Sequence, residues 1–77
     1  MKLIQILGTG CPKCEKLKKN AEEAVKAAGT EALVEKITDI GQITAFGVIM
    51  TPALAIDGEV KAVGKVLSAD EIKAFLQ

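Results

Sequence analysis

The chain has 77 residues, of which 49% are hydrophobic, and its ten basic and ten acidic side chains leave no net charge. This length predicts one domain, residues 1–77, with a single core. The balanced charge and the lack of a basic stripe argue against nucleic acid as the main partner. No apolar run approaches the ~18 residues of a membrane span, so no membrane role is expected.

Cys11 and Cys14 are the only cysteines in the chain. A disulfide framework is therefore excluded, and the close spacing suits a redox or metal-binding role in a reducing compartment. The first two residues lead directly into a strand pattern rather than into a signal peptide. These features together predict a cytoplasmic protein.

The first half of the chain predicts a βαβ unit. Residues 2–7 are apolar except for Lys2 and one Gln, a pattern typical of a strand buried on both faces. Residues 12–28 predict a helix that ends at Gly29. Its apolar positions recur at helical spacing: Cys14, Leu17, Ala21, Ala24, Val25 and Ala28. Residues 31–37 predict a second strand, parallel to the first through a right-handed crossover.

A short helix and a hairpin are predicted next. Asp39, followed three residues later by Gln42, is a candidate N-cap for the short helix. The apolar side of this helix is expected to consist of Ile40, Ile43, Ala45 and Phe46. Asp57-Gly58 is a strong two-residue turn signal, which predicts a hairpin of strands over residues 53–56 and 59–63.

The last predicted element is a helix that follows Ser68. Ser68 and Glu71 form a capping box, the usual signature of a helix N-terminus. The apolar residues of this helix recur at helical spacing and are expected to be buried: Ile72, Phe75 and Leu76. The complete order is βαβαββα, without repeats or low-complexity segments, which places the chain in the α/β class.

The segment from residue 8 to residue 14, Gly-Thr-Gly-Cys-Pro-Lys-Cys, places both thiols at the junction between the first strand and the first helix. Cys11 falls at the N-cap, Pro12 at the first helical position and Cys14 in the first turn. A helix N-terminus carries unsatisfied N–H groups and a partial positive charge, which favour a thiolate. Cys14 belongs to the buried stripe and Cys11 to the exposed tip, as expected of a resolving and an attacking thiol.

Thr51-Pro52 stands immediately before the first strand of the hairpin. A proline at the first residue of a strand removes no ladder hydrogen bond, so an ordinary trans peptide bond is compatible with this position. Only ~5–6% of X-Pro bonds in folded proteins are cis. The combination of Cys-X-X-Cys, the element order and Thr-Pro before the hairpin nevertheless favours the cis form.

These motifs together resemble the thioredoxin superfamily, and in particular the small archaeal and bacterial thioredoxin-like proteins called redox-active disulfide protein 2. The matching features span essentially the whole chain and are residues 8–14, Thr51-Pro52-Ala53, the Asp57-Gly58 turn and Gly64. The resemblance implies a thioredoxin/glutaredoxin-like α/β fold with a four-stranded mixed sheet in the order 2-1-3-4. The first and third helices would cover one face and the second helix the other, with a cis Thr51–Pro52 bond beside the cysteines.

The resemblance further implies a thiol–disulfide oxidoreductase that reduces protein disulfides. Cys11 would be the nucleophile and Cys14 the resolving thiol. The implied substrate-binding residues are Gly10, Pro12, Met50, Thr51, Pro52 and Gly64. The implied partners are disulfide-containing protein substrates and a thioredoxin-reductase-like electron donor, without a cofactor or a metal. We expect the protein to be a monomer.

Three positions depart from the pattern of related families. Gly10 stands where typical thioredoxins have Trp, and Gln5 stands where they have a buried acid. Acid–base assistance to Cys14 is therefore expected from water or not at all. Gly64-Lys65 stands where glutaredoxins have a Gly-Asp-like glutathione contact. Together with the absence of Arg and His, this favours a reductase over glutathione as the electron donor.

A soft-metal or metalloid binding module is the alternative use of the same two thiolates, which are suitable ligands for Cu(I), Zn(II) or As(III). Copper chaperones use the order βαββαβ, which this chain does not follow. A structural zinc site normally takes four ligands, and two cysteines without histidine supply them only in a dimer. A structural domain with an incidental cysteine pair is the third interpretation.

Overall fold

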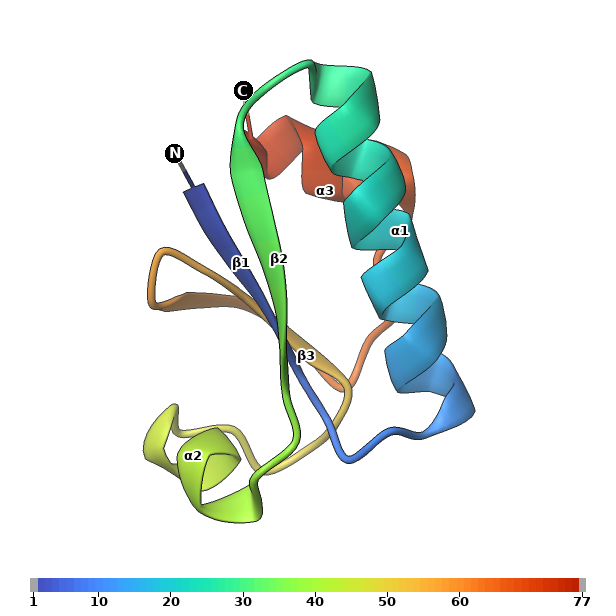
Figure 1. Cartoon of the computed structure of the whole chain (residues 1–77). Coiled ribbons are helices and arrows are strands. Elements are labelled where there is room, and N and C mark those ends of the chain that lie inside the picture. Colours follow the sequence, from blue (N-terminus) through green and yellow to red (C-terminus); the bar gives the residue numbers. More distant parts are fainter. Residues whose placement is uncertain (1, 77) are drawn as a thin grey trace.

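The computed structural model of the protein describes residues 2–76 (Figure 1). Its elements are β1 (Lys2–Leu7), α1 (Pro12–Ala28), β2 (Ala32–Ile37), α2 (Ile40–Ala45), β3 (Ala53–Ile56), β4 (Glu59–Val63) and α3 (Ala69–Leu76). This order confirms the predicted βαβαββα arrangement. Met1 and Gln77, the two ends of the predicted domain, lie outside the described residues.

The four strands form one mixed sheet in the predicted order β2-β1-β3-β4. β1 and β2 are parallel, with Leu3 opposite Leu33. β3 runs antiparallel to β1, and β4 runs antiparallel to β3. The hairpin turn has left-handed backbone at Asp57 (φ 52°) and Gly58 (φ 84°), the conformation that a type I′ turn requires at both central residues.

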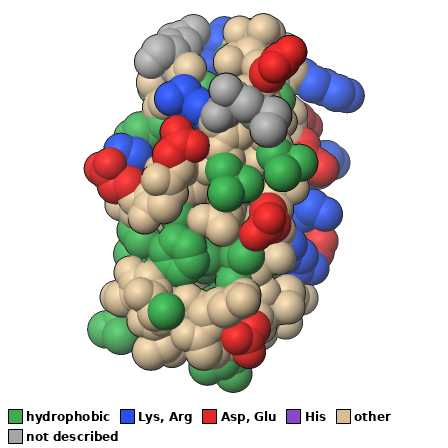
Figure 2. Space-filling view, turned by 60° about the vertical axis from the view of Figure 1, so that its left-hand side comes forward, with side chains coloured by type: hydrophobic (Ala, Val, Ile, Leu, Met, Phe, Trp, Pro, Cys, Tyr) green, Lys and Arg blue, Asp and Glu red, His purple; other side chains and the backbone are tan. Residues whose placement is uncertain are grey.

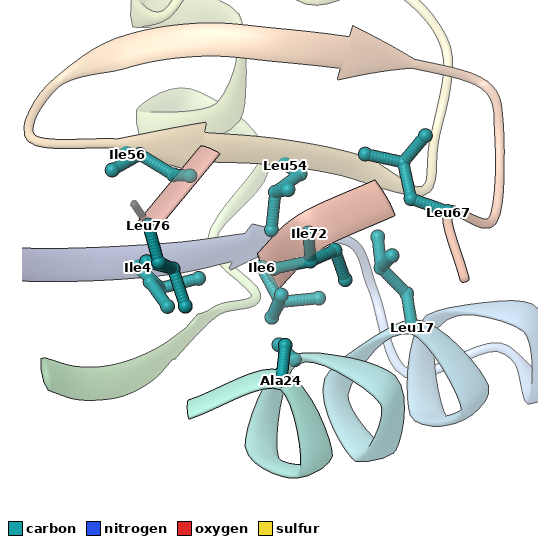
Figure 3. Close-up of a cluster of buried hydrophobic side chains, with 10 residues drawn as sticks. Ile4, Ile6, Leu17, Ala24, Leu54, Ile56, Leu67, Ile72 and Leu76 are labelled. Carbon is teal, nitrogen blue, oxygen red and sulfur yellow. The ribbon is translucent and has the colours of Figure 1, made fainter. Parts of the chain in front are cut away.

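Helices α1 and α3 cover one face of the sheet, and α2 lies on the other face near the end where β1 stops (Figure 1). Figure 3 shows how side chains from β1, β3, α1 and α3 meet in the larger core cluster. Its buried members are Ile4, Ile6, Leu17, Ala21, Ala24, Leu54, Ile56, Leu67, Ile72 and Leu76. The predicted apolar stripe of α1 is therefore the surface that packs on the sheet and on α3.

The smaller core cluster includes residues of α2, the sheet and the adjoining loop. Its buried members are Leu7, Ile37, Ile43, Val48, Ala53 and Ala55. Phe46 packs against this cluster at partial exposure. The predicted apolar side of α2 is wrong at Ile40, which is 68% exposed, and at Ala45, which is also exposed. A helix of six residues makes fewer than two turns, so Ile43 is its only buried position.

Phe75 is a third position at which the predicted burial is wrong. Its side chain is 40% exposed, whereas Ile72 and Leu76 of the same helix are buried. The Lys61 ammonium lies over the Phe75 ring, 5.7 Å from its centroid, within the range of a cation–π contact. Lys61 belongs to β4, which is an edge strand, so this ring lies against the edge of the sheet.

Several contacts hold α1 in place. Gly29 ends the helix in the left-handed conformation (φ 64°), and its N–H donates to two carbonyl oxygens of the last turn. The Asn20 side-chain amide donates to the Leu67 carbonyl at 2.9 Å and ties α1 to the loop before α3. Glu15 forms an ion pair with Lys36 of β2. The ion pair between Glu15 and Lys36 holds the first turn of α1 against β2.

The core clusters predict where truncation destabilises the fold. Leu54 is fully buried on β3, so Leu54→Ala is expected to lower the free energy of unfolding by about 2–5 kcal/mol. Leu33→Ala, at a side chain that is 52% exposed, is the matched control and is expected to cost less than about 1 kcal/mol. Urea denaturation followed by circular dichroism measures both. Equal losses would contradict the assigned core.

Candidate active site

The site begins where β1 ends. Gly8 is buried and its N–H donates to the Ile37 carbonyl at 2.9 Å, which extends the β1–β2 pairing by one residue. Gly10 has a positive φ of 95°, a conformation that glycine adopts without a Cβ clash, and it turns the chain toward α1. Gly10 and Pro12 are exposed on either side of Cys11. The loop therefore presents Cys11 at the surface.

Cys11 is the N-cap residue of α1, with extended backbone (φ −68°, ψ 162°). Its Sγ accepts a hydrogen bond from the Cys14 N–H, with a donor–acceptor distance of 3.3 Å. Hydrogen bonding from the Cys14 thiol and then from the Cys14 N–H lowers the pKa of Cys11, because both donors favour the thiolate. A partly exposed thiol that ionises easily is the chemistry of a nucleophile.

Cys14 has the opposite environment. Its side chain is 1% exposed and begins the buried stripe of α1. Burial raises the pKa of Cys14, and its hydrogen bond to Cys11 raises it further, because that bond is donated by the protonated thiol. The two thiols of the pair thus differ in exposure and in acidity. Cys11 is therefore the more acidic thiol of the pair and loses its proton before Cys14 does.

The segment before β3 lies beside the cysteines. The Thr51–Pro52 peptide bond is cis. Thr51 is exposed and Pro52 is fully buried. A Cβ built on Gly8 would lie in contact with Cys14 and 3.9 Å from the Thr51 Cβ, so the end of β1 brings Thr51 and Cys14 together. The exposed residue Thr51 therefore adjoins the dithiol.

Met50 and Gly64 form the next part of this surface. The Gly64 N–H donates to the Pro52 carbonyl at 2.8 Å, which joins the end of β4 to the start of β3. A Cβ at Gly64 would lie 3.2 Å from the Met50 Cε, so the Met50 side chain rests on this glycine. The Met50 side chain is 58% exposed. The residues predicted for substrate binding thus form two neighbouring groups. Gly10 and Pro12 lie beside Cys11, and the others surround Pro52: Met50, Thr51 and Gly64.

A groove of about 280 Å³ adjoins the site and was not predicted from the sequence. It is lined by Thr9, Ile40, Ile43, Thr44, Val48, Ile49 and Thr51. Ile49 is 93% exposed and Ile40 is 68% exposed. Figure 2 shows hydrophobic side chains at the surface in the lower part of the molecule, where α2 and the loop that follows it lie. The run Val48-Ile49-Met50, apolar but outside any predicted element, was the available signal.

Neither a buried acid nor a metal cluster accompanies the pair within residues 2–76. Gln5 is half-buried and donates to a Glu35 carboxylate oxygen at 3.3 Å, and none of the described polar or charged side chains is buried. The same residues contain no group of three or more His, Cys, Asp and Glu side chains that could hold a metal ion. None of the described helices is long and apolar enough to cross a membrane.

A Cys-X-X-Cys pair at the N-terminus of the first helix of a thioredoxin-like fold defines the class of thiol–disulfide oxidoreductases. Comparison with known proteins agrees with this class. Residues 2–77 match the family described as thioredoxin domain. A thioredoxin of Methanothermobacter thermautotrophicus is 51% identical over 76 residues, which are 99% of each chain. A thioredoxin of Methanocaldococcus jannaschii is 40% identical over 77 residues, which are 100% of this chain and 88% of the relative. The chain therefore belongs to the thioredoxin domain family.

The hydrogen bond between the thiols predicts how Cys14 substitutions change Cys11. Cys14→Ala removes the thiol donor but keeps the backbone N–H, and Cys14→Ser keeps a side-chain donor. The Cys11 pKa is expected to rise above that of the wild type in Cys14→Ala and to rise less in Cys14→Ser. A higher pKa leaves less thiolate at neutral pH, so alkylation of Cys11 slows there. Thiolate ultraviolet absorbance in a pH titration measures each pKa, and identical values in all three proteins would contradict the assigned bond.

Proposed function

We propose that this protein reduces protein disulfides with the Cys11–Cys14 dithiol and acts as an electron carrier. The observation that carries the proposal is the division between the two thiols. Cys11 is partly exposed with a lowered pKa, and Cys14 is buried with a raised pKa. Reduction of a disulfide by a dithiol needs an accessible thiolate first and a second, protected thiol afterwards.

In the first step, the Cys11 thiolate attacks one sulfur of a substrate disulfide. The substrate S–S bond breaks, a mixed disulfide forms, and the departing substrate thiolate takes a proton from solvent. In the second step, Cys14 releases its proton to solvent and attacks the Cys11 sulfur. The mixed disulfide breaks, the second substrate sulfur leaves as a thiolate that takes a proton from solvent, and a Cys11–Cys14 disulfide remains. Two electrons have passed from the protein to the substrate, and a reductase must return two.

The surface around the dithiol supports docking of a polypeptide. Thr51 is exposed next to Cys14, and Met50, which rests on Gly64, forms an apolar rim beside Pro52. Gly10 and Pro12 border Cys11 without bulky side chains that would block its approach. The groove between α2 and Thr51 offers space for an apolar side chain of the same substrate. We assign these residues to substrate binding.

The setting of this reaction follows from the family and the site. Thioredoxin-family chemistry requires disulfide-containing substrates and a reductase donor, and we propose a thioredoxin-reductase-like enzyme as that donor. We also propose that the protein is a monomer. A single sheet joins elements from both halves of the chain, which supports the proposal of one domain. A cytoplasmic location fits a dithiol that must be kept reduced.

Insulin reduction with dithiothreitol tests the proposed chemistry directly. The wild type is expected to precipitate insulin well above the dithiothreitol background, because the Cys11 thiolate is accessible. Cys11→Ser is expected to fall to the background. Cys14→Ser is expected to retain the first step and to accumulate a mixed disulfide that mass spectrometry detects. A wild-type rate equal to the background, with the protein folded and both thiols free, would refute the reductase proposal.

The groove predicts a difference between large and small substrates. Ile49→Asp places a charge at the groove and is expected to raise KM for a protein disulfide about tenfold, since burial of an Ile side chain is worth roughly 1.5–3 kcal/mol. The rate with a small aromatic disulfide is expected to stay within about twofold, because the thiols are untouched. Leu33→Asp, at another exposed apolar residue, is the matched control. Equal effects of the two substitutions on KM would remove the groove from the binding surface.

A further inference from the structure

Gly8 is packed against the sulfur of Cys14. A Cβ built on Gly8 would overlap the Cys14 Sγ, far inside van der Waals contact, and would lie 3.1 Å from the Cys14 Cβ. Gly8 is not among the glycines with positive φ, so its backbone conformation is open to any residue. Glycine is therefore required at this position because the sulfur of Cys14 occupies the space that a Cβ would need.

The other glycines of the chain do not share this feature. Gly10, Gly29, Gly47 and Gly58 have open space where a Cβ would stand. Gly64 meets the Met50 side chain, which is exposed and flexible, and Gly41 meets a carboxylate oxygen at an ordinary 3.4 Å. Gly8, by contrast, is anchored in the sheet by its hydrogen bond to Ile37. Neither the backbone at Gly8 nor the helix that carries Cys14 is free to retreat.

We propose that Gly8 is the positioning residue of the resolving thiol: the space left by its missing Cβ is the seat that holds the Cys14 Sγ out of solvent and directed at Cys11. This inference rests on the proposed function, in which Cys14 closes the reaction. The seat lies between the end of β1 and Thr51, where the Cys14 side chain is 1% exposed. The raised pKa of Cys14, caused first by burial, agrees with such a seat.

A methyl group at Gly8 would displace the sulfur of Cys14. Because α1 fixes its backbone, the side chain must rotate about χ1 to another staggered position. The sulfur then leaves the seat, gains solvent and loses its alignment with Cys11. Gly8→Ala is therefore expected to release the Cys14 thiol while leaving the remaining fold in place.

Alkylation of Cys14 in the Cys11→Ser background tests the seat without any reductase activity. Ser keeps the N-cap hydrogen bond and leaves Cys14 as the single thiol. Gly8→Ala in this background is expected to speed iodoacetamide modification about tenfold at neutral pH and to move the midpoint of its pH profile down by about one unit. Gly41→Ala in the same background is the control, since its Cβ meets no tight contact. A rate and midpoint equal to those of the control would overturn the proposal.

A double-mutant cycle covers the case in which Gly8→Ala unfolds the protein. Cys14→Ala removes the sulfur that a Cβ at Gly8 would overlap and leaves only the longer contact, 3.1 Å, with the Cys14 Cβ. If Gly8 serves the sulfur, Gly8→Ala destabilises the Cys14→Ala protein much less than the wild type, so the two effects are not additive. Urea denaturation measures all four proteins. An equal loss of stability in both backgrounds would show that the need for glycine does not depend on the Cys14 sulfur. That result would overturn the proposal, whatever the insulin assay shows.

Discussion

The packing of one stripe of α1 against the sheet and α3 is the constraint on which the site depends. Leu17, Ala21 and Ala24 are fully buried in the larger core cluster, and their burial fixes the rotation of the helix about its axis. Cys14 begins the same stripe and is buried with it. Cys11 lies at the cap, outside the helical repeat, and stays partly exposed. Core packing thus imposes the difference between the two thiols.

One hydrogen bond serves both the fold and the chemistry. The Cys14 N–H is one of the donors that an α-helix leaves unsatisfied at its N-terminus, and the Cys11 Sγ accepts from it. As a cap, the sulfur stabilises the start of α1. The pKa of the Cys11 thiol is lowered first by the Cys14 thiol and then by this same backbone contact. The residue that ends the loop is therefore also the nucleophile that we propose. The Cys11 Sγ is thus both the helix cap and the proposed reactive atom.

Much of the architecture was predictable because the signals that define it are local. The helical spacing of Leu17, Ala21 and Ala24 predicted α1, the Asp57-Gly58 pair predicted the hairpin, and Cys11 was identified as an N-cap. Each of these signals depends on residues within a few positions of one another, so the sequence displays it directly. The order of the strands came from the family resemblance, and the sheet confirms it.

The element order, the dithiol and the side of α1 that faces the core follow from local patterns in the chain. The folded structure brought together residues that lie far apart in the chain: Cys14 rests on Gly8, and Met50 rests on Gly64. It also left Ile40 and Phe75 exposed, because the short helix α2 and the edge strand β4 cover too little surface. Local propensity depends on neighbours in the chain, whereas burial depends on neighbours in space, and those exist only once the sheet has formed.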